Sequence, residues 1–323
     1  MSLTIWCNTK FNPAATKLLE EGTRAHRLVV STMTSASVLV AGQTDPALLE
    51  AQVAFGQPDA DDCLRHRGLK WVEVSSAGYT RYDRDDLREE FRGRGTALTN
   101  ASGVFADPCA QHVLAQMLAL GRQLPQSLRD QFTDRGWHYA ERRYDSRLLT
   151  GQTVLLLGFG AIGRRLAELL APFGVTLIAV RRQTRSERSV RIIPEEAVSS
   201  ALAQADHIVN ILPENDATRN YVNARRLACA KPGARFYNVG RGVTVDQGAL
   251  LDALQSGRLG AAYLDVTDPE PLPPDHPLWT APNCFITPHT GGGRHDQDEA
   301  LVRHFLANLA AFEQGGELAD RVV

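Results

Sequence analysis

Near the middle of the 323-residue chain, four apolar residues lead directly into three spaced glycines. The apolar run is Val154-Leu155-Leu156-Leu157; the glycines are Gly158, Gly160 and Gly163, separated by Phe159, Ala161 and Ile162. This order predicts a strand, a tight turn at Gly158 and a helix over residues 164–173 that packs closely at Gly163. Gly160 would let the backbone approach a pyrophosphate, which the N–H groups at the helix N-terminus would bind. The motif therefore predicts a dinucleotide-binding α/β unit.

The rest of the chain repeats the α/β pattern, and its length exceeds what one hydrophobic core usually fills. Short apolar runs alternate with potentially helical stretches, which is typical of parallel sheets with crossover helices. The expected strands are residues 3–7, 28–30, 38–41, 69–74, 97–99, 153–157, 176–180, 207–212, 235–239, 262–266 and 285–287. The sequence thus predicts two doubly wound α/β domains.

Between the two groups of strands, a long buried helix is expected from Asp107 to Gly121. Asp107 would cap it and Pro108 would occupy its first position. Residues 122–150 are polar and arginine-rich, and are interpreted as an irregular arm between domains or subunits. Apolar residues at helical spacing predict an amphipathic helix over residues 296–313.

Composition excludes several classes of protein. A formal net charge of −2 gives no basic excess for nucleic-acid binding. The longest apolar stretch falls far short of the roughly 20 residues that a membrane span needs. The N-terminus lacks a secretion signal, which makes a cytoplasmic location the expectation. The five cysteines are scattered without a Cys-x-x-Cys pair, so no metal site is expected.

The end of the strand after the glycine motif bears on the choice of cofactor. An acidic residue about 20 positions beyond the motif would hold the ribose hydroxyls of NAD. Here residues 176–180 are followed by Arg181 and Arg182 instead. Guanidinium groups match a 2′-phosphate, so we expect NADP(H) to be preferred, with NAD(H) left open as an alternative.

Three further residues of catalytic type follow strands of the second domain. Arg241 comes after the strand ending near Val239 and Gly240, Glu270 follows the next strand, and His289 follows the last. Open α/β sheets bind their ligands at these carboxyl ends. A fixed guanidinium suits a carboxylate, and a histidine beside a carboxylate suits proton transfer. The order predicts the reduction of a small 2-oxo acid or the reverse oxidation.

Four motifs taken together carry a resemblance. They are Gly158-x-Gly160-x-x-Gly163, Asn238-Val239-x-Arg241-Gly242, Leu264-Asp265-Val266 with Glu270-Pro271-Leu272, and Thr287-Pro288-His289-x-Gly291-Gly292. The chain resembles the D-isomer-specific 2-hydroxyacid dehydrogenases, and in particular their glyoxylate/hydroxypyruvate reductases. The resemblance implies a Rossmann domain at residues 102–290 inserted in a flavodoxin-like substrate domain formed by residues 1–101 and 291–323. It also implies the D isomer and a homodimer.

The resemblance also implies residue roles. Arg241 would bind the substrate carboxylate and polarise the carbonyl, His289 would donate the proton, and Glu270 would orient the imidazole. Asp265 would hydrogen-bond the nicotinamide carboxamide. The loop Ser76-Ala77-Gly78 would hold the substrate carboxylate through its N–H groups, although Tyr79-Thr80 replaces the usual aliphatic and acidic pair. Further positions expected at the cofactor are Leu212, Pro213, Thr218, Val239, Gly240 and Gly291.

Other functions occur on the same scaffold. Formate dehydrogenases usually carry glutamine where this chain has Glu270, which weighs against formate as the substrate. A phosphite-type dehydrogenase would use a similar arginine, glutamate and histidine set, so that alternative stays open. A non-catalytic NAD(P)-sensing protein would not need the full trio.

Overall fold

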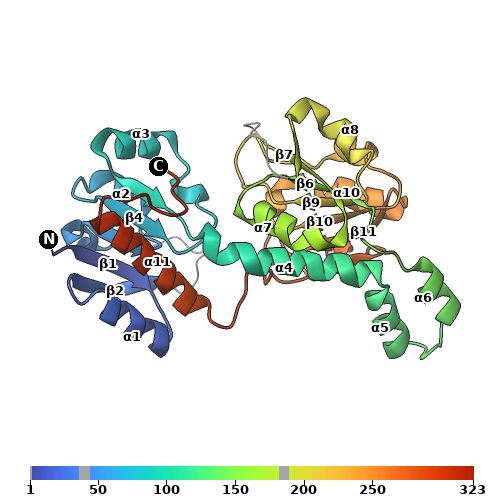
Figure 1. The fold of residues 1–323 in the computed structure, drawn as a ribbon, viewed down its shortest axis with the longest axis horizontal. Helices are drawn as coiled ribbons and strands as arrows, with labels where there is room; N and C mark the ends of the chain where they lie inside the picture. Colours follow the sequence, from blue (N-terminus) through green and yellow to red (C-terminus); the bar gives the residue numbers. More distant parts are fainter. Residues whose placement is uncertain (1, 36–43, 182–188) are drawn as a thin grey trace. The chain divides into compact units, whose positions relative to one another are not determined.

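The computed structural model describes residues 2–35, 44–181 and 189–323. The chain forms two compact units, one made of Met1–Phe105 with Arg294–Val323 and the other of Ala106–Gly293 (Figure 1). The divisions fall within a few residues of the expected boundaries at 101/102 and 290/291.

The first unit is built on a parallel sheet with the order β2-β1-β3-β4-β5 in its described residues. The strands are β1 (Thr4–Thr9), β2 (Arg27–Ser35), β3 (Val53–Gly56), β4 (Trp71–Val74) and β5 (Ala97–Thr99). Helices α1 (Pro13–Gly22) and α11 (Gln297–Glu313) pack on one face, and α2 (Ala60–Arg65) and α3 (Asp85–Arg94) on the other. The strand expected at residues 38–41 lies outside the described residues, and β3 was not predicted.

Aromatic stacking joins the C-terminal helix to this sheet. The Phe305 ring of α11 lies 4.2 Å from the Phe55 ring and 5.2 Å from the Trp71 ring, measured between centroids. All three side chains are fully buried. The amphipathic helix predicted over residues 296–313 is confirmed, and it completes the core of the N-terminal sheet.

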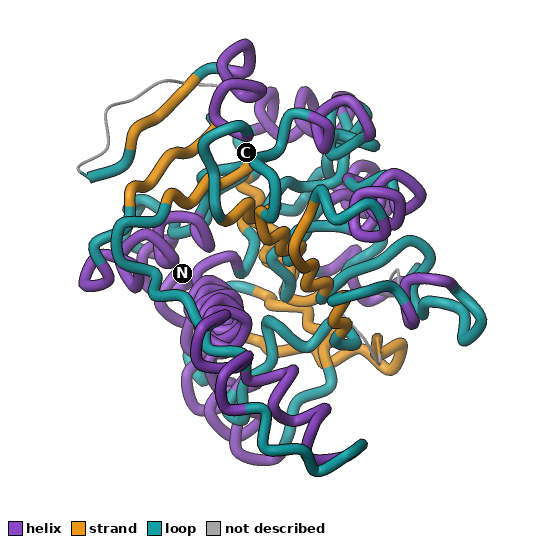
Figure 2. The backbone as a smooth tube through the Cα atoms, turned by 90° about the vertical axis from the view of Figure 1, so that its right-hand side faces the viewer, coloured by secondary structure: helices purple, strands orange, loops and turns teal. Residues whose placement is uncertain are grey.

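The second unit has a parallel sheet with the order β12-β11-β10-β9-β6-β7-β8. Its strands are β6 (Thr153–Leu157), β7 (Thr176–Val180), β8 (Arg191–Ile193), β9 (His207–Asn210), β10 (Ala234–Asn238), β11 (Leu259–Leu264) and β12 (Cys284–Ile286). Helices α4 (Ser102–Gly121) and α7 (Ala161–Leu170) cover one face; α8 (Val198–Leu202), α9 (Ala224–Ala228) and α10 (Gln247–Gln255) cover the other. In Figure 2 the strands run between layers of helix. The order reverses between β6 and β9, where such sheets bind nucleotides.

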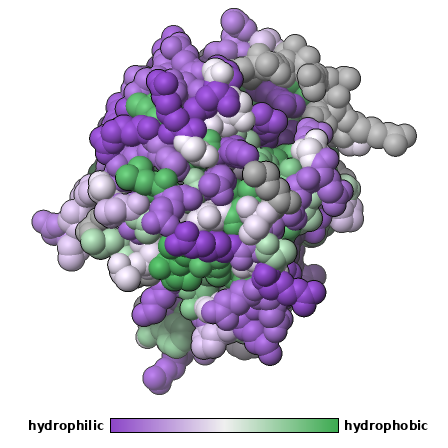
Figure 3. All heavy atoms as spheres, turned by 90° about the vertical axis from the view of Figure 1, so that its left-hand side faces the viewer, coloured by the Kyte–Doolittle hydropathy of each residue, from purple (hydrophilic) through white to green (hydrophobic). Residues whose placement is uncertain are grey.

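Single turns of 3₁₀ helix fill several connections. They are η1 (Pro46–Glu50), η2 (Thr80–Tyr82), η3 (Ala171–Phe173), η4 (Glu195–Ala197), η5 (Gly242–Thr244) and η6 (Pro277–Thr280). Among the described residues, no helix is long and apolar enough to cross a membrane. The face drawn in Figure 3 is mainly hydrophilic, with apolar side chains gathered in a few patches.

Two sequence predictions about the middle of the chain are wrong. The helix α4 begins at Ser102 rather than after Asp107, and Pro108 lies inside it. The Asn100 side chain accepts the Ser102 N–H at 3.1 Å, and the buried Ala101 and Val104 anchor the first turn, which offsets the cost of the proline.

The arm after α4 is not irregular. It contains α5 (Leu124–Phe132) and α6 (Tyr139–Asp145), which extend away from the sheet in Figure 1. A bidentate ion pair joins the two helices, because Arg142 Nε and Nη2 donate to the Asp130 carboxylate at 2.6 and 2.8 Å. This charged segment therefore forms a helical hairpin rather than the irregular arm that the sequence predicted.

The C-terminal segment is tied to the rest of the first unit by a half-buried histidine. His304 donates from Nδ1 to Glu73 at 3.0 Å and from Nε2 to Asp320 at 3.1 Å. Glu73 also accepts from Asn308 at 2.7 Å. Burial alone would lower the pKa of His304, but the hydrogen bonds and charges of Asp320 and Glu73 raise it to about 9. The imidazolium thus joins β4 to the end of the chain.

This pair of contacts predicts a pH-dependent stability. The folded pKa of His304 is above its ordinary 6.5, so its contribution is complete below about pH 6.5 and is lost as the pH rises through about 9. The melting temperature should fall by several degrees from pH 6 to pH 10, and His304→Gln should flatten that part of the profile. An unchanged slope in His304→Gln would contradict the prediction.

Candidate active site

The glycine turn lies at the carboxyl end of β6, next to the point where the strand order reverses. Gly158 has φ +98°, a conformation that side-chain-bearing residues rarely adopt. A Cβ at Gly163 would lie 3.2 Å from the Gly158 carbonyl oxygen, whereas a Cβ at Gly160 would meet nothing within 4 Å. The backbone is therefore open at Gly160 and tight on both sides of it, which fits the approach of a pyrophosphate to the N-terminus of α7.

The residues between these glycines have structural surroundings of their own. Phe159 is buried in the core beneath α4 and α7, while Ala161 and Ile162 are half-buried in the first turn of α7. The backbone N–H groups of these residues can bind a cofactor, but the Phe159 ring packs in the core. The sequence motif predicts cofactor contacts at all of these positions and does not distinguish the two roles.

Arg181 follows β7 directly, beside the glycine turn. The parallel register pairs Leu157 with Val180, so the carboxyl ends of β6 and β7 lie next to each other. Arg181 is half-buried there. The second arginine of the cofactor prediction, Arg182, lies outside the described residues.

The loop after β9 lies against the glycine turn. A Cβ at Gly158 would be 3.3 Å from the Ile211 carbonyl oxygen and 3.6 Å from a Leu212 methyl group. The Thr218 hydroxyl donates to the Pro213 carbonyl at 2.6 Å, which folds the loop back on itself. Leu212 thus lies against the glycine turn, whereas Thr218 stabilises the shape of the loop.

Arg241 follows β10 between two glycines that permit close backbone contact. A Cβ at Gly240 would lie 2.7 Å from the Leu212 carbonyl oxygen, and one at Gly242 would lie 1.9 Å from that of Thr267. The Arg241 guanidinium donates from Nη1 to the Gly240 carbonyl at 2.7 Å. The turn brings the ends of β9, β10 and β11 together.

Buried amides fix this turn from beneath. Asn210 donates to the Asn238 side-chain oxygen at 2.9 Å, and that oxygen also accepts the Gly240 N–H at 3.1 Å. The Thr244 hydroxyl donates to the Arg241 carbonyl at 2.6 Å. Asn210 and Thr244 were not singled out in the sequence, where nothing distinguishes them from ordinary polar residues.

His289 and Glu270 form a direct pair. The distance between His289 Nδ1 and Glu270 Oε2 is 2.9 Å, and each side chain is about one-third exposed, at 31% and 32%. Glu270 Oε1 accepts the Thr267 N–H at 3.1 Å. Partial burial would raise the pKa of Glu270, but the His289 hydrogen bond and the charges of His289 and Arg241 bring it below 4.5. Glu270 therefore interacts electrostatically with both His289 and Arg241, and it is ionised at neutral pH.

The backbone of His289 is in the left-handed region, with φ +52°. For a residue other than glycine this conformation costs of order 1–3 kcal/mol and persists only when neighbours impose it. The His289 N–H donates to the Asp265 carbonyl at 2.9 Å. The imidazole direction is thus set by the turn that follows β12.

Asp265 is buried beneath this turn. Its side chain is 4% exposed and accepts from the Thr287 hydroxyl at 2.6 Å and from the N–H groups of Thr290 and Gly291, both at 2.9 Å. A carboxamide contact by Asp265 was expected from sequence. The contacts show a second use of the same carboxylate, as the acceptor that holds the histidine turn.

The expected substrate loop belongs to the first unit. The Ser76 hydroxyl donates to the Gly78 carbonyl at 2.6 Å and accepts from the buried Gln57 amide at 3.0 Å. The Asn100 side chain donates to the Ala77 carbonyl at 2.9 Å. The loop therefore has a defined shape within its own unit.

Residues 114–291 match the family model described as "D-isomer specific 2-hydroxyacid dehydrogenase, NAD binding domain". The chain is 33% identical over 250 residues to a glyoxylate reductase/hydroxypyruvate reductase of Homo sapiens, covering 76% of this chain and 75% of the human protein. It is 32% identical over 228 residues to a glyoxylate reductase of Aeropyrum pernix, covering 68% of each chain.

A solved structure agrees over the whole length. The D-isomer specific 2-hydroxyacid dehydrogenase of Xanthobacter autotrophicus Py2, solved in complex with NADPH and MES, superposes with a TM-score of 0.82 at 28% identity, covering 100% of this chain and 98% of that one. The protein therefore belongs to the D-isomer specific 2-hydroxyacid dehydrogenase family and is an NAD(P)-dependent oxidoreductase.

Proposed function

We propose that this enzyme reduces a small 2-oxo acid, of the glyoxylate or hydroxypyruvate type, to the D-2-hydroxy acid with NADPH. The observation that carries the proposal is the His289–Glu270 pair, which lies within the electrostatic reach of Arg241 in the unit that holds the glycine turn. The human and Aeropyrum pernix relatives, named as reductases of such acids, support the substrate class.

The chemistry divides among these side chains. The Arg241 guanidinium binds the substrate carboxylate and draws electron density toward the carbonyl oxygen, where negative charge develops. His289 donates a proton to that oxygen from Nε2, because its Nδ1 is engaged by Glu270. The ionised Glu270 stabilises the imidazolium before transfer. NADPH, when bound, supplies the hydride. The substrate loop Ser76-Ala77-Gly78 is proposed to bind the carboxylate through its N–H groups.

The direct test is NADPH oxidation with a panel of 2-oxo acids that includes glyoxylate and hydroxypyruvate. We expect turnover with at least one of these small acids. Phosphite with NADP belongs in the panel, since a phosphite dehydrogenase would use the same three side-chain types. Turnover of phosphite alone would replace the proposal, and no turnover of any 2-oxo acid would refute it.

Cofactor preference is predicted from the end of β7. Arg181 stands where an acid would hold the ribose of NAD, and the Xanthobacter relative was solved with NADPH. We expect kcat/KM with NADPH to exceed that with NADH by about tenfold or more, and Arg181→Ala to reduce only the NADPH value. Arg191→Ala, an exposed arginine on neighbouring β8, should change neither. An efficiency with NADH equal to that with NADPH would refute the preference.

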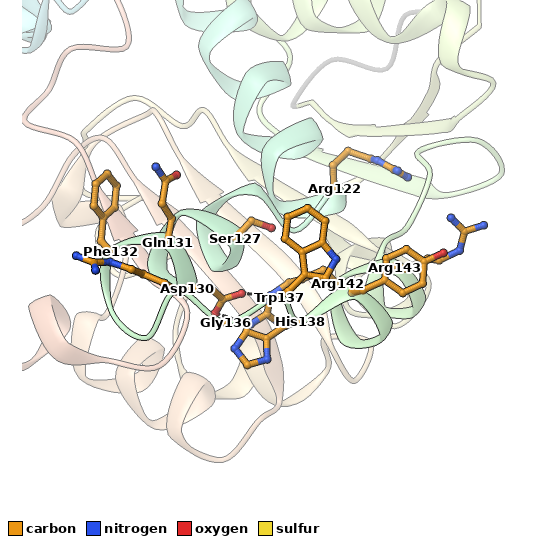
Figure 4. Close-up of a pocket in the computed structure, with 12 residues that line it drawn as sticks. Arg122, Ser127, Asp130, Gln131, Phe132, Gly136, Trp137, His138, Arg142 and Arg143 are labelled. Atoms are coloured by element: carbon orange, nitrogen blue, oxygen red, sulfur yellow. Dashed lines mark hydrogen bonds and ion pairs between the residues drawn. The ribbon is translucent and has the colours of Figure 1, made fainter.

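The arm is proposed to bind a second copy of the chain. Large exposed apolar side chains gather on it: Leu124, Leu128, Phe132, Trp137, Tyr139, Tyr144 and Leu148. A groove of about 970 Å³ lies among α5, α6 and the loop between them (Figure 4). So much apolar surface is unusual for a monomer and typical of an interface.

We therefore expect a homodimer of twice 35.4 kDa by light scattering. Trp137 is 92% exposed, and Trp137→Glu should shift the protein toward the monomer. Trp279→Glu, at a 47% exposed tryptophan outside the arm, should leave the dimer intact. A monomeric wild-type protein would contradict the proposal. The cytoplasmic location stays a prediction from the sequence.

A further inference from the structure

A chain of hydrogen bonds runs from α4 to the turn that carries His289. His112 Nε2 contacts the Tyr263 hydroxyl, and that hydroxyl contacts Thr287 Oγ1. Thr287 donates to Asp265 Oδ1 at 2.6 Å. Tyr263 is 1% exposed, so this series of hydrogen bonds lies inside the second unit. None of these contacts is required by the sheet itself.

These hydrogen bonds all run in one direction from donor to acceptor, because each hydroxyl has only one proton to donate. Thr287 gives its only hydroxyl proton to the carboxylate, so it must accept from Tyr263. Tyr263 then has no proton left for His112, and must accept from the His112 Nε2–H. Burial raises the pKa of Tyr263 above its ordinary value of 10, which keeps the phenol a donor. His112, Tyr263 and Thr287 therefore each donate toward the Asp265 side of the series.

Steric contact acts at the same place. A Cβ at Gly291 would lie 2.7 Å from Asp265 Oδ2 and 3.3 Å from His112 Cδ2. The backbone of the turn at Gly291 thus lies directly against the Asp265 carboxylate and the His112 imidazole. Asp265 meets the turn through its carbonyl, at the His289 N–H, and through both carboxylate oxygens. The strained φ of His289 is imposed from this side.

We propose that His112, Tyr263 and Thr287 are positioning residues for catalysis, which hold Asp265 beneath the 287–291 turn and thereby fix the direction of the His289 imidazole toward Glu270 and the substrate. Loss of one hydroxyl leaves the Asp265 carboxylate less constrained, and the turn can then relax from its left-handed conformation. The effect reaches the reaction through kcat, because the acid is misplaced while the binding groups remain. The proposal rests on His289 being the acid of the proposed function.

A matched pair of tyrosines provides the test. Tyr237 of β10 is the register partner of Tyr263, is equally buried, and contacts another histidine, with its hydroxyl 3.0 Å from His207 Nδ1. Both Phe variants lose one buried hydroxyl, but only Tyr263 is connected to Asp265. We expect Tyr263→Phe to lower kcat about tenfold with KM within about twofold, and Tyr237→Phe to keep the wild-type kcat at a similar loss of melting temperature.

Variants of Thr287 provide a second, independent test. Thr287→Ser keeps the hydroxyl and should retain kcat, while the nearly isosteric Thr287→Val should lose it as Tyr263→Phe does. The NADPH dissociation constant, measured by fluorescence, should change by less than about threefold in all four variants. Equal kcat losses in Tyr263→Phe and Tyr237→Phe, or equal activity of the two Thr287 variants, would overturn the proposal.

One readout does not depend on turnover. The imidazole NMR resonances of His289 report the contact of its ring with Glu270. They should shift or broaden in Tyr263→Phe as the turn relaxes, and keep their wild-type positions in Tyr237→Phe. If the wild-type enzyme reduced none of the 2-oxo acids, the proposed function would fail, and these resonances would still decide the positioning role. Unchanged His289 resonances in Tyr263→Phe would overturn it.

Discussion

Replacing His289 with alanine should lower kcat by about a thousandfold and leave the NADPH dissociation constant within about twofold of wild type. The imidazole is the group positioned to give a proton to the substrate oxygen, with Nδ1 held 2.9 Å from Glu270. The glycine turn and Arg181 are untouched by the change. Stopped-flow reduction with a reactive 2-oxo acid and fluorescence titration of NADPH would measure the two quantities separately.

Two further variants test the same assignment of His289 as the acid. Glu270→Gln preserves a hydrogen bond but removes the charge, so kcat should fall less than in His289→Ala. His276→Ala removes a half-buried histidine whose ring accepts the Leu278 N–H, outside the proposed trio, and should leave kcat unchanged. Turnover near wild type in His289→Ala would show that His289 is not the acid.

Replacing Gly242 with alanine should damage both stability and activity. The new Cβ would be placed 1.9 Å from the Thr267 carbonyl oxygen and 2.0 Å from its carbonyl carbon, so one of two backbone segments must move. One carries Arg241 and the other leads to Glu270. We expect a loss of about 3 kcal/mol, a melting temperature lower by about 6–12 °C, and kcat/KM reduced at least tenfold.

Gly248→Ala is the matched control. Gly248 lies in the first turn of α10, and its Cβ would come no closer than 3.4 Å to Asp246 Oδ1, an ordinary contact. Alanine is favoured over glycine in a helix by about 1 kcal/mol, so stability should hold or rise. If Gly242→Ala melted and turned over like Gly248→Ala, the tight packing of the Arg241 turn would be refuted.

The parts of the fold that the sequence predicted well share a local origin. The strands β6 and β7 were predicted with their observed bounds, because a buried parallel strand is a continuous apolar run. The positive φ of Gly158 follows from the strand–turn–helix order around it. Arg241, Glu270 and His289 were recognisable because each closes a short motif at a strand end.

The parts that it missed depend on distant contacts. The short strands β3 and β8 contain few residues, and only pairing with β1, β4 and β7 defines them. Pro108 by itself predicts a helix start, yet α4 begins six residues earlier because Ala101 and Val104 pack in the core of the first unit. The antiparallel bridge between Thr99 and Arg321 joins residues that are 222 positions apart in the sequence.

By itself, the sequence determined the two α/β units, the dinucleotide motif and the identity of the proposed catalytic trio, since all three are written in local patterns of strand, turn and side-chain type. Only the tertiary structure decided what lies beneath His289. His112 and Tyr263 are 151 positions apart, and their contact exists because α4 packs on the face of the sheet that Tyr263 occupies. A periodic pattern encodes burial along one element, but a hydrogen bond between elements depends on packing that no local pattern records.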